Sequence, residues 1–333
     1  MKDFVLMCKK IGSMPDYVQG GGGNASCKHG ENKMAIKASG YTIGDITEDT
    51  GYVDVDYLKI KDYHTNYSPD EIDKKEKEST PFLISCVLPT DGPALRPSVE
   101  TGFHSLLKKY VMHTHPVYTN VITCAKDGKQ LAEKICKGMD FVWIPYINPG
   151  FSLTLAINEA ITAYEMEKGV IPNVIFLENH GLVTTADDAK ECADLHIKVN
   201  EAVKKYFGLK DFSADLTMTE DGDKFISSAD FVKNYFAKYD VSTMEQYALY
   251  PDQLVYLNSG MQDGKITFCD NKAIISAAKK EAMAMLETFA AFAYVIDSIH
   301  SAGLTVHTMD AEATGFINNW ESEKYRKAMA KQG

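Results

Sequence analysis

Residues 111–116 read Val-Met-His-Thr-His-Pro, an apolar run that ends in two histidines one residue apart. Side chains alternate between the faces of a β-strand, so His113 and His115 are predicted to point to the same side. Two such imidazoles are half of a transition-metal site. A third candidate, His180, ends the apolar run Phe176-Leu177-Glu178-Asn179-His180-Gly181. Three histidine ligands with an open fourth position are typical of catalytic zinc.

The composition narrows the class of partner. The chain has 333 residues, 45% of them hydrophobic, and a net charge of −11. A chain this acidic has no general attraction to nucleic acid or to anionic lipid, so neither nucleic acid nor a membrane is an expected partner. Seven scattered cysteines without a Cys-x-x-Cys pair, and an amino terminus unlike a secretory signal, indicate a reduced, cytoplasmic protein. The longest apolar run, near 289–296, is well short of the roughly 20 residues of a membrane helix.

Two turns upstream of the histidines could meet an anion. Residues 20–26 read Gly-Gly-Gly-Gly-Asn-Ala-Ser, and residues 37–40 read Lys-Ala-Ser-Gly. Glycines let main-chain N–H groups approach an anion closely, although a flexible turn explains four glycines equally well. No Gly-Lys-Ser/Thr follows, so the first turn is not a Walker loop, and its spacing is not that of a dinucleotide fingerprint.

The segment before the histidine pair is predicted to open a helix. Ser98 is placed to cap it, and Glu100 falls in its first turn, where the helix dipole favours a carboxylate. Capping alone would explain Glu100, so a catalytic role needs other support. His104 lies four residues further on the same helix face and is the other candidate neighbour of the site, although a structural role is favoured for it.

The remaining pattern predicts an α/β fold. Helices are predicted at 2–11, from 98, at 119–138, 153–168, 187–207 and 272–300, strands at 35–40, 52–56, 141–147 and 174–179, with 182–185 continuing the last strand, and a solvated loop or helix face at 68–80. Because strands and helices do not alternate strictly, we expect three α/β/α layers around a mainly antiparallel or mixed sheet. Residues 1–209 would form the catalytic domain and residues 210–333 a mostly helical extension packed on it.

These residues together form a known pattern. Five motifs occur in order: Gly-Gly-Gly-Asn-Ala-Ser (21–26), Lys-Ala-Ser-Gly (37–40), Pro-Ser-Val-Glu-Thr (97–101), His-Thr-His-Pro (113–116) and Glu-Asn-His-Gly (178–181). The chain thereby resembles the class II aldolase/adducin family over about residues 17–208. Three further stretches are most similar to the aldolase portion of bifunctional rhamnulose-1-phosphate aldolase/dehydrogenases: 145–151, 250–256 and 320–326.

The resemblance implies a zinc-dependent aldolase that cleaves a ketose 1-phosphate to dihydroxyacetone phosphate and an aldehyde. His113, His115 and His180 would hold Zn²⁺, with Co²⁺ or Mn²⁺ as substitutes, and the cation would stabilise an enediolate. Glu100 would be the acid/base, and Tyr146 would donate a proton. The implied phosphate ligands are Asn24, Ser39, the Gly40 amide and Ser98, with Lys28 and Lys37 as extra charge. A homotetramer is also implied.

Related activities share this site pattern. Pentulose-phosphate 4-epimerases of the family typically have aspartate where this chain has Glu100, so Glu100 favours the aldolase. Thioribulose-phosphate dehydratases share the histidines and stay open as an alternative. Adducin-like scaffolds have lost the three histidines that this chain keeps, and a generic zinc hydrolase would need no anion-binding turns. Val99 stands where fuculose-phosphate aldolases have a second serine, which puts the need for a phosphate in question.

Overall fold

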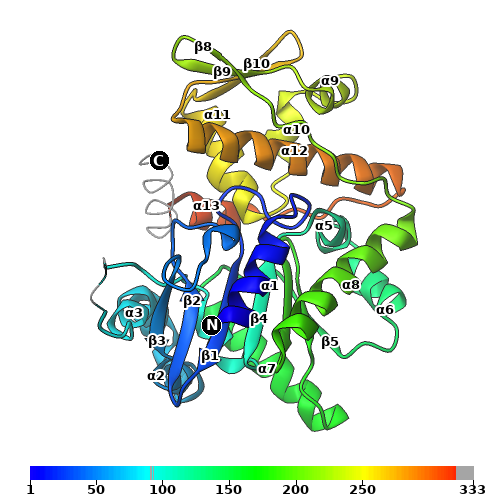
Figure 1. Cartoon of the computed structure of the whole chain (residues 1–333). Helices are drawn as coiled ribbons and strands as arrows, with labels where there is room; N and C mark the ends of the chain where they lie inside the picture. The colour runs from blue at the N-terminus through cyan, green and yellow to red at the C-terminus, as the bar shows by residue number, and fades with distance from the viewer. Residues whose placement is uncertain (91, 93, 320–333) are drawn as a thin grey trace.

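The computed structural model describes residues 1–90, 92 and 94–319. A seven-stranded sheet forms the centre of the amino-terminal two thirds, in the order β3-β2-β1-β4-β7-β6-β5 (Figure 1). All its neighbouring strands are antiparallel except β5 and β6, which are parallel. The α/β class with a mixed sheet is therefore confirmed. The aldolase-like stretch 320–326 lies outside the described residues.

The elements of this part include the predicted ones in order, together with a strand at 24–29 and a helix at 57–65 that were not predicted. They are α1 (Lys2–Gly12), β1 (Asn24–His29), β2 (Lys33–Lys37), η1 (Ile43–Asp45), β3 (Tyr52–Asp56), α2 (Tyr57–Thr65), η2 (Pro69–Glu71), α3 (Ile72–Ser85), α4 (Thr101–Leu106), β4 (Tyr110–Thr114), α5 (Val117–Thr123), α6 (Gly128–Ile135), β5 (Phe141–Ile144), α7 (Phe151–Lys168), β6 (Val174–Leu177), β7 (Gly181–Ala186) and α8 (Ala189–Phe207). The single helix predicted at 119–138 is wrong, because a turn separates α5 from α6.

Helices cover both faces of the sheet, since alternate residues of the central strands are apolar on either side. Helices α1 and α8 pack on one face against Ala25 of β1 and Met112 of β4. Helices α4 and α7 pack on the other face against Val111 of β4 and Val183 of β7. This alternation sends His113 to the α4 side, where its ring meets Phe103 edge-on at 5.9 Å between centroids. The three predicted layers are therefore observed.

The third histidine lies in a hairpin that the sequence analysis missed. Residues 182–185 do not continue the strand before His180, because β6 and β7 are antiparallel and Leu177 pairs with Gly181. The chain reverses at Asn179, whose φ of 49° is in the left-handed region that asparagine tolerates better than most residues. A Cβ on Gly181 would lie 2.3 Å from the Thr114 carbonyl oxygen. Glycine there lets the hairpin approach the end of β4.

The carboxy-terminal part is mostly helical but also contains a sheet. Its elements are β8 (Thr219–Asp221), β9 (Lys224–Ser227), α9 (Asp230–Phe236), α10 (Val241–Gln246), the π-helix η3 (Gln253–Asn258), α11 (Ser259–Gln262), β10 (Ile266–Cys269), β11 (Lys272–Ile275), α12 (Lys279–Ser301) and α13 (Ala311–Asn319). Strands β8–β11 form a four-stranded sheet in the order β10-β11-β9-β8. The helix predicted from residue 272 is wrong at its start, because 272–275 form a strand paired with β9 and β10.

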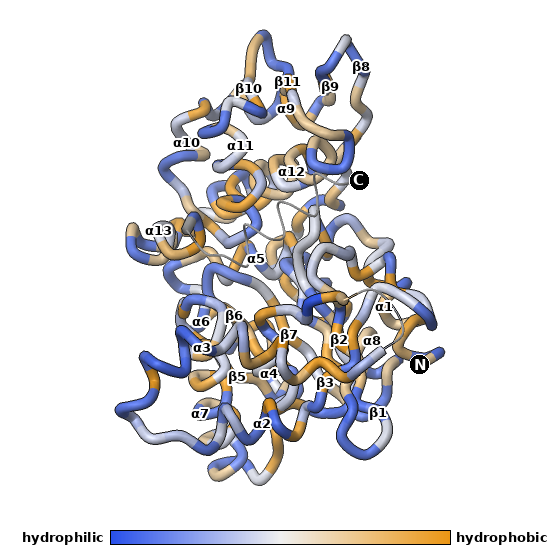
Figure 2. The backbone as a smooth tube through the Cα atoms, turned by 90° about the vertical axis from the view of Figure 1, so that its left-hand side faces the viewer, coloured by the Kyte–Doolittle hydropathy of each residue, from blue (hydrophilic) through white to orange (hydrophobic). Residues whose placement is uncertain are grey.

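Helix α12 joins this part to the rest of the molecule. Its Phe289 and Phe292 are fully buried in a cluster that also contains Val117 and Val121 of α5. By length and composition α12 could cross a membrane, but 72% of its most apolar window is buried inside the protein, which is typical of a core helix. Figure 2 shows the apolar colour concentrated in α12 and the central strands, with hydrophilic loops at the β8–β9 end.

Candidate metal centre and active site

The three predicted histidines meet in one buried cluster. Nε2 of His113 and Nε2 of His115 lie 3.2 Å apart, which confirms that both side chains point to the same side of β4. The ring of His180 lies 4.9 Å from that of His113 and 5.0 Å from that of His115, between centroids. One nitrogen of each residue lies within 4.8 Å of the others, and all three residues are buried.

The hydrogen bonds made by Nδ1 of His113 and Nδ1 of His115 indicate which nitrogen of each ring carries a proton. Nδ1 of His113 donates to the Leu182 carbonyl at 3.0 Å, and Nδ1 of His115 bonds the Asp252 carboxylate. A neutral imidazole carries one proton, so Nε2 of His113 and Nε2 of His115 then face each other with lone pairs. Two nitrogens bound at roughly 2.0–2.1 Å to a tetrahedral ion would be roughly 3.3–3.4 Å apart, close to the observed separation.

Burial favours the neutral, metal-binding form of His113. It lowers the pKa of His113, because the charged ring is desolvated, and the nearby Glu100 carboxylate only partly opposes this. A metal ligand must be the neutral imidazole, so a lowered pKa favours binding. The chemistry of the three side chains therefore fits a divalent transition metal.

Glu100 faces the histidines. Its Oε1 lies 3.4 Å from His180 Nε2 and its Oε2 lies 3.6 Å from His113 Nε2, and the side chain is 9% exposed. Oε2 accepts a hydrogen bond of 2.6 Å from the Asn24 amide, whereas the buried Oε1 has no hydrogen-bond partner among the described residues. A buried carboxylate oxygen without a donor is costly, which fits a position that a cation or substrate fills.

The expected capping arrangement is wrong. Helix α4 begins at Thr101, one residue after Glu100, and the Glu100 side chain makes no capping hydrogen bond. Ser98 instead accepts from the main-chain N–H of Glu100 at 3.3 Å through its hydroxyl, ahead of the helix. Capping therefore does not explain Glu100, and its orientation toward the histidines does.

The predicted phosphate ligands divide into two groups. Asn24 and Ser98 lie together, 3.2 Å between Nδ2 and Oγ, and beside Glu100. Asn24 is already occupied, since its Nδ2 donates to Glu100 and its Oδ1 bonds His104. Ser39 and Gly40 lie in the turn after β2. This turn is tied to the segment that contains Ser98, because the Ser39 N–H donates to the carbonyl of the residue before Pro97 at 2.8 Å.

Neither lysine of the turns offers a free charge to the cluster. Nζ of Lys28 donates to the carbonyls of Leu107 and Lys108, and burial lowers the pKa of this lysine to about 8. Nζ of Lys37 donates to the Tyr41 carbonyl at 2.7 Å. Both ammonium groups therefore hold main-chain carbonyls.

Tyr146 packs against the carboxy-terminal part. Its ring lies among apolar residues that include Leu254 and Met309. Its hydroxyl donates to Asn148 at 3.2 Å, and its N–H donates to Glu178, two residues before His180. Burial raises the pKa of the Tyr146 hydroxyl, so it stays protonated at neutral pH.

Two site residues have roles that the sequence pattern did not assign. Asp252, from the carboxy-terminal part, is fully buried and bonds His115. His104, expected to be structural, bonds Ser26 at 2.8 Å and the amide oxygen of Asn24, which orients that amide toward Glu100. In the sequence, Asp252 was singled out only as part of the stretch 250–256, noted for its resemblance. Its contact partner, His115, lies 137 residues away, so no local pattern links the two.

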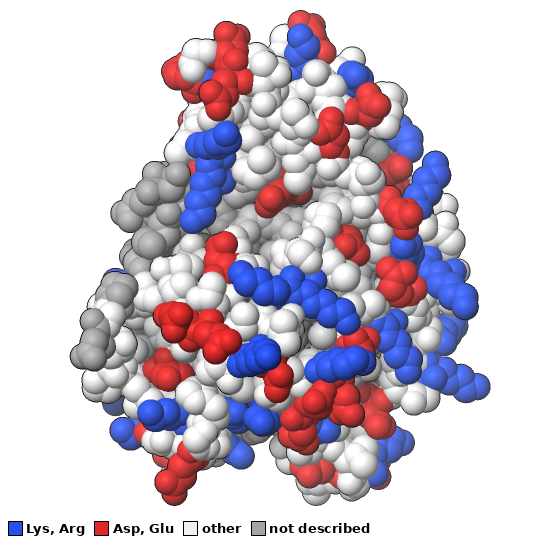
Figure 3. Space-filling model, viewed as in Figure 1, with Lys and Arg blue, Asp and Glu red and all other residues white. Residues whose placement is uncertain are grey.

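A pocket of about 500 Å³ lies where the two parts meet. It is lined by both predicted anion-binding turns, through Gly20, Gly21 and Gly40, and by Lys279, Lys280 and Glu287 of α12. Figure 3 shows the molecular surface hollowed between the carboxy-terminal part and the domain below it, with basic side chains at one end of the hollow. Glu287 accepts a 2.6 Å hydrogen bond from the Gly20 N–H in this wall.

The fold and the cluster together define an α/β protein with a buried three-histidine centre at the ends of strands of a mixed sheet. The Class II Aldolase and Adducin N-terminal domain matches residues 2–207, and the chain belongs to this family. Residues 208–333 lie outside that match.

Three relatives are similar to parts of the chain. An uncharacterized oxidoreductase, YuxG, of Bacillus subtilis (strain 168) is 31% identical over 215 residues, which are 62% of this chain and 29% of that protein. The chain thus spans less than a third of that relative. The N-terminal class II aldolase domain of a conserved protein from Thermoplasma acidophilum is 28% identical and superposes with a TM-score of 0.51 over 61% of this chain and 92% of that one. L-fuculose-1-phosphate aldolase from Thermus thermophilus is 12% identical, with a TM-score of 0.40 over 62% and 92%.

Proposed function

We propose that this protein is a metal-dependent aldolase that cleaves a ketose 1-phosphate of the rhamnulose or fuculose type to dihydroxyacetone phosphate and an aldehyde. The observation that carries the proposal is the buried cluster of His113, His115 and His180, with the Glu100 carboxylate directed at it. Family membership supports the class of chemistry. The aldolase portion of bifunctional rhamnulose-1-phosphate aldolase/dehydrogenases is the proposed nearest type, from the stretches 145–151 and 250–256.

Zinc is the proposed cation, with Co²⁺ or Mn²⁺ able to replace it. The three histidines would hold it, since imidazole suits zinc and cobalt. When bound, a divalent cation would polarise the substrate carbonyl and offset the negative charge that develops on its oxygen.

Glu100 is the proposed acid/base. Retro-aldol cleavage needs a base at the C4 hydroxyl, and Oε1 of Glu100 has a lone pair that no donor of the described residues occupies. The Asn24 amide holds the other oxygen at 2.6 Å and so fixes the direction of the carboxylate. Glu100 would take the C4 hydroxyl proton as the bond between C3 and C4 breaks. It would then return the proton to C3 of the three-carbon fragment, which gives dihydroxyacetone phosphate.

The substrate phosphate would bind at the turn of Ser39 and Gly40, with Ser98 and Asn24 at its inner end. The pocket beside Gly40 supports this placement, because Lys280 and Lys279 line it, the latter 3.7 Å from Glu220, whereas Lys28 and Lys37 hold main-chain carbonyls. These two lysines of α12 would also offset the hydroxyl that is lost where Val99 replaces a serine. A doubly charged phosphate would then be held from both parts of the chain.

Tyr146 is the proposed proton donor to the aldehyde oxygen when the reaction runs in the carbon–carbon-forming direction, since burial keeps its hydroxyl protonated. In the described conformation that hydroxyl donates to Asn148, so in this role it would exchange that acceptor for the substrate oxygen. The homotetramer and the cytoplasmic location are likewise proposals. Light scattering on the purified protein tests the first, and fractionation of cells tests the second.

The deciding experiment is a substrate screen. Purified protein supplied with zinc is offered rhamnulose 1-phosphate, fuculose 1-phosphate and other ketose 1-phosphates, and release of dihydroxyacetone phosphate is measured with a coupled enzyme. Ribulose 5-phosphate is offered in parallel and its epimerisation measured by NMR, because the same histidines would serve a 4-epimerase or a dehydratase. Carbon–carbon cleavage supports the proposal, whereas epimerisation or water loss without cleavage would replace it.

A further inference from the structure

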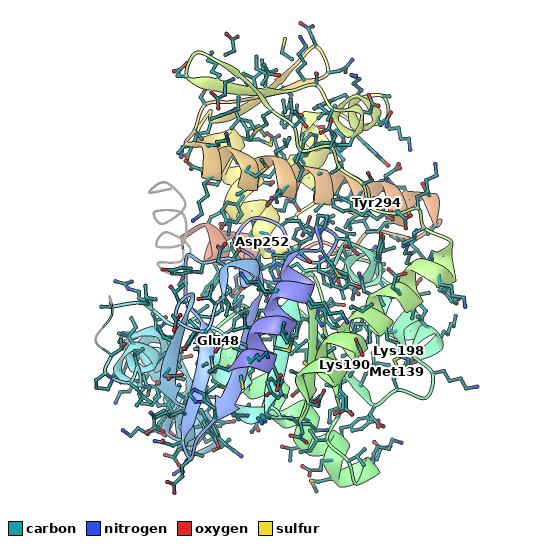
Figure 4. The ribbon with its side chains drawn as sticks, in the orientation of Figure 1. Glu48, Met139, Lys190, Lys198, Asp252 and Tyr294 are labelled. Carbon is teal, nitrogen blue, oxygen red and sulfur yellow. The ribbon has the colours of Figure 1, made fainter. Side chains whose placement is uncertain are left out.

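A buried carboxylate from outside the family domain reaches the histidine cluster. Asp252 lies immediately before η3 and is fully buried, yet its side chain makes no capping hydrogen bond to that helical segment. Its Oδ2 bonds Nδ1 of His115 instead. Figure 4 shows Asp252 at the junction between the carboxy-terminal part and the domain below. The contact with His115 therefore joins this buried carboxylate to the cluster.

This contact decides which nitrogen of His115 can bind a cation. A carboxylate accepts only from a protonated nitrogen, so Nδ1 carries a proton, and in the neutral imidazole that binds a metal Nε2 then holds the lone pair. Nε2 is the atom that lies 3.2 Å from Nε2 of His113. Carboxylates placed in this way fix the orientation of a metal-binding imidazole and raise its basicity.

The glycine turn leaves room for this carboxylate. A Cβ on Gly22 would lie 2.0 Å from Oδ2 of Asp252 and 2.9 Å from its Cγ. The absence of a side chain at residue 22 is thus what allows Asp252 to reach His115. Part of the glycine run therefore receives carboxylates of the carboxy-terminal part, Asp252 at Gly22 and Glu287 at Gly20.

The same part of the chain also holds the third histidine. Asn179, immediately before His180, donates from its side-chain amide to the carbonyls of Leu249 and His307, each at 2.9 Å. Its Oδ1 accepts from Nδ1 of His307 at 2.6 Å. These bonds fix a residue whose φ of 49° is otherwise strained, and so they fix the turn that presents His180.

We propose that the carboxy-terminal part, through Asp252, Leu249 and His307, completes the metal centre, with Asp252 as a positioning residue for His115. The inference rests on the proposed function, since it assumes that the histidines bind a divalent cation. Residues outside the family domain would thus help to form the metal site. Two of the three histidines are oriented from there.

The test is zinc binding to the full-length protein after its metal has been removed with a chelator. The zinc affinity is measured by competition with a chromophoric chelator, and the visible absorption of the Co²⁺-loaded protein reports the ligand geometry. Asp252→Asn keeps the size of the side chain and removes its charge, so we expect the zinc affinity to fall about 10- to 100-fold and the Co²⁺ spectrum to change. Glu281→Gln is the matched control, because Glu281 is a buried acid of α12 that pairs with Lys265 instead. Its zinc affinity should stay within about two-fold.

The outcomes separate this inference from the proposed function. If the unaltered protein binds zinc and Asp252→Asn binds it equally with the same Co²⁺ spectrum, the inference is wrong and the aldolase proposal stands. If the unaltered protein binds neither ion, both are wrong. Should Asp252→Asn fail to fold, ¹⁵N NMR of selectively labelled histidines in the unaltered, metal-free protein decides. A proton on Nδ1 of His115 supports the inference, and a proton on Nε2 overturns it.

Discussion

Substitutions of single residues at the cluster test the proposed roles, and Glu100 gives the clearest test. Glu100→Gln keeps the shape of the side chain and a contact with Asn24, but an amide cannot accept the hydroxyl proton. We expect kcat for carbon–carbon cleavage to fall about 10²- to 10⁴-fold with a small change in KM. Release of dihydroxyacetone phosphate measures this, with Glu281→Gln as the control. Unchanged cleavage by Glu100→Gln would refute the acid/base role.

Metal content follows from the histidines themselves. His113→Ala removes a ligand nitrogen that lies 3.2 Å from Nε2 of His115, and we expect the bound zinc to fall from one ion per chain to a small fraction of that. Elemental analysis of the purified proteins measures it. His196→Gln is the control, because His196 is buried and hydrogen-bonded to Thr114 and Thr184 but lies outside the cluster. Equal zinc in both variants would contradict a site at His113.

The buried His64 predicts how stability depends on pH. Burial lowers its pKa to about 4, while the unfolded chain has the ordinary value near 6.5. The unfolded state therefore binds more protons between these values, and stability is lost as the pH falls from about 6.5 toward 4. One such group contributes at most about 1.4 kcal/mol per pH unit. His64→Gln cannot be protonated there, so urea unfolding at pH 7, 6 and 5 should show a shallower loss than in the unaltered protein.

Among the elements, the β6–β7 hairpin depends on one residue at its reversal. Asn179 has a φ of 49° and three side-chain hydrogen bonds to the carboxy-terminal part. Asn179→Ala loses the bonds and adds backbone strain of about 1–3 kcal/mol, whereas Asn179→Gly loses only the bonds. We expect urea unfolding to rank alanine below glycine, and both below asparagine. The reverse order for the two variants would show that the left-handed backbone is not strained.

Several elements show how well the local pattern of apolar residues predicts the limits of a helix or strand. The strand at 52–56 and the helices near 2–11, 153–168 and 187–207 are observed close to their predicted limits, because each carries a clear period of apolar residues. The reversal at Asn179 and the strand at 272–275 were missed. Both depend on partners distant in the sequence, the Thr114 carbonyl and strand β9, which no local period reveals.

At the scale of the whole molecule, the two parts share one hydrophobic cluster between α5 and α12. We therefore expect them to unfold together. Phe289→Ala removes a fully buried ring of α12, and large-to-small changes of this kind cost about 3–5 kcal/mol. Fluorescence of Trp143 in β5, in a Trp320→Phe background, should shift to the same lower denaturant midpoint as circular dichroism of the whole chain. A Trp143 transition that stays in place would show that the parts unfold separately.

The sequence by itself predicted the layered α/β fold, the shared face of His113 and His115, and His180 as the third candidate ligand. These predictions need only the alternation of side chains along a strand and five short motifs, which can be read directly from the sequence. The tertiary structure decided that Glu100 does not cap its helix, that Asn24 is held by His104, and that Asp252 enters the centre from the carboxy-terminal part. The contacts that Asn24 makes with Glu100 and His104, and that Asp252 makes with His115, join residues 76 or more positions apart. Their geometry depends on how the sheet, hairpin and carboxy-terminal part pack together, and nothing in a single stretch of sequence specifies that packing.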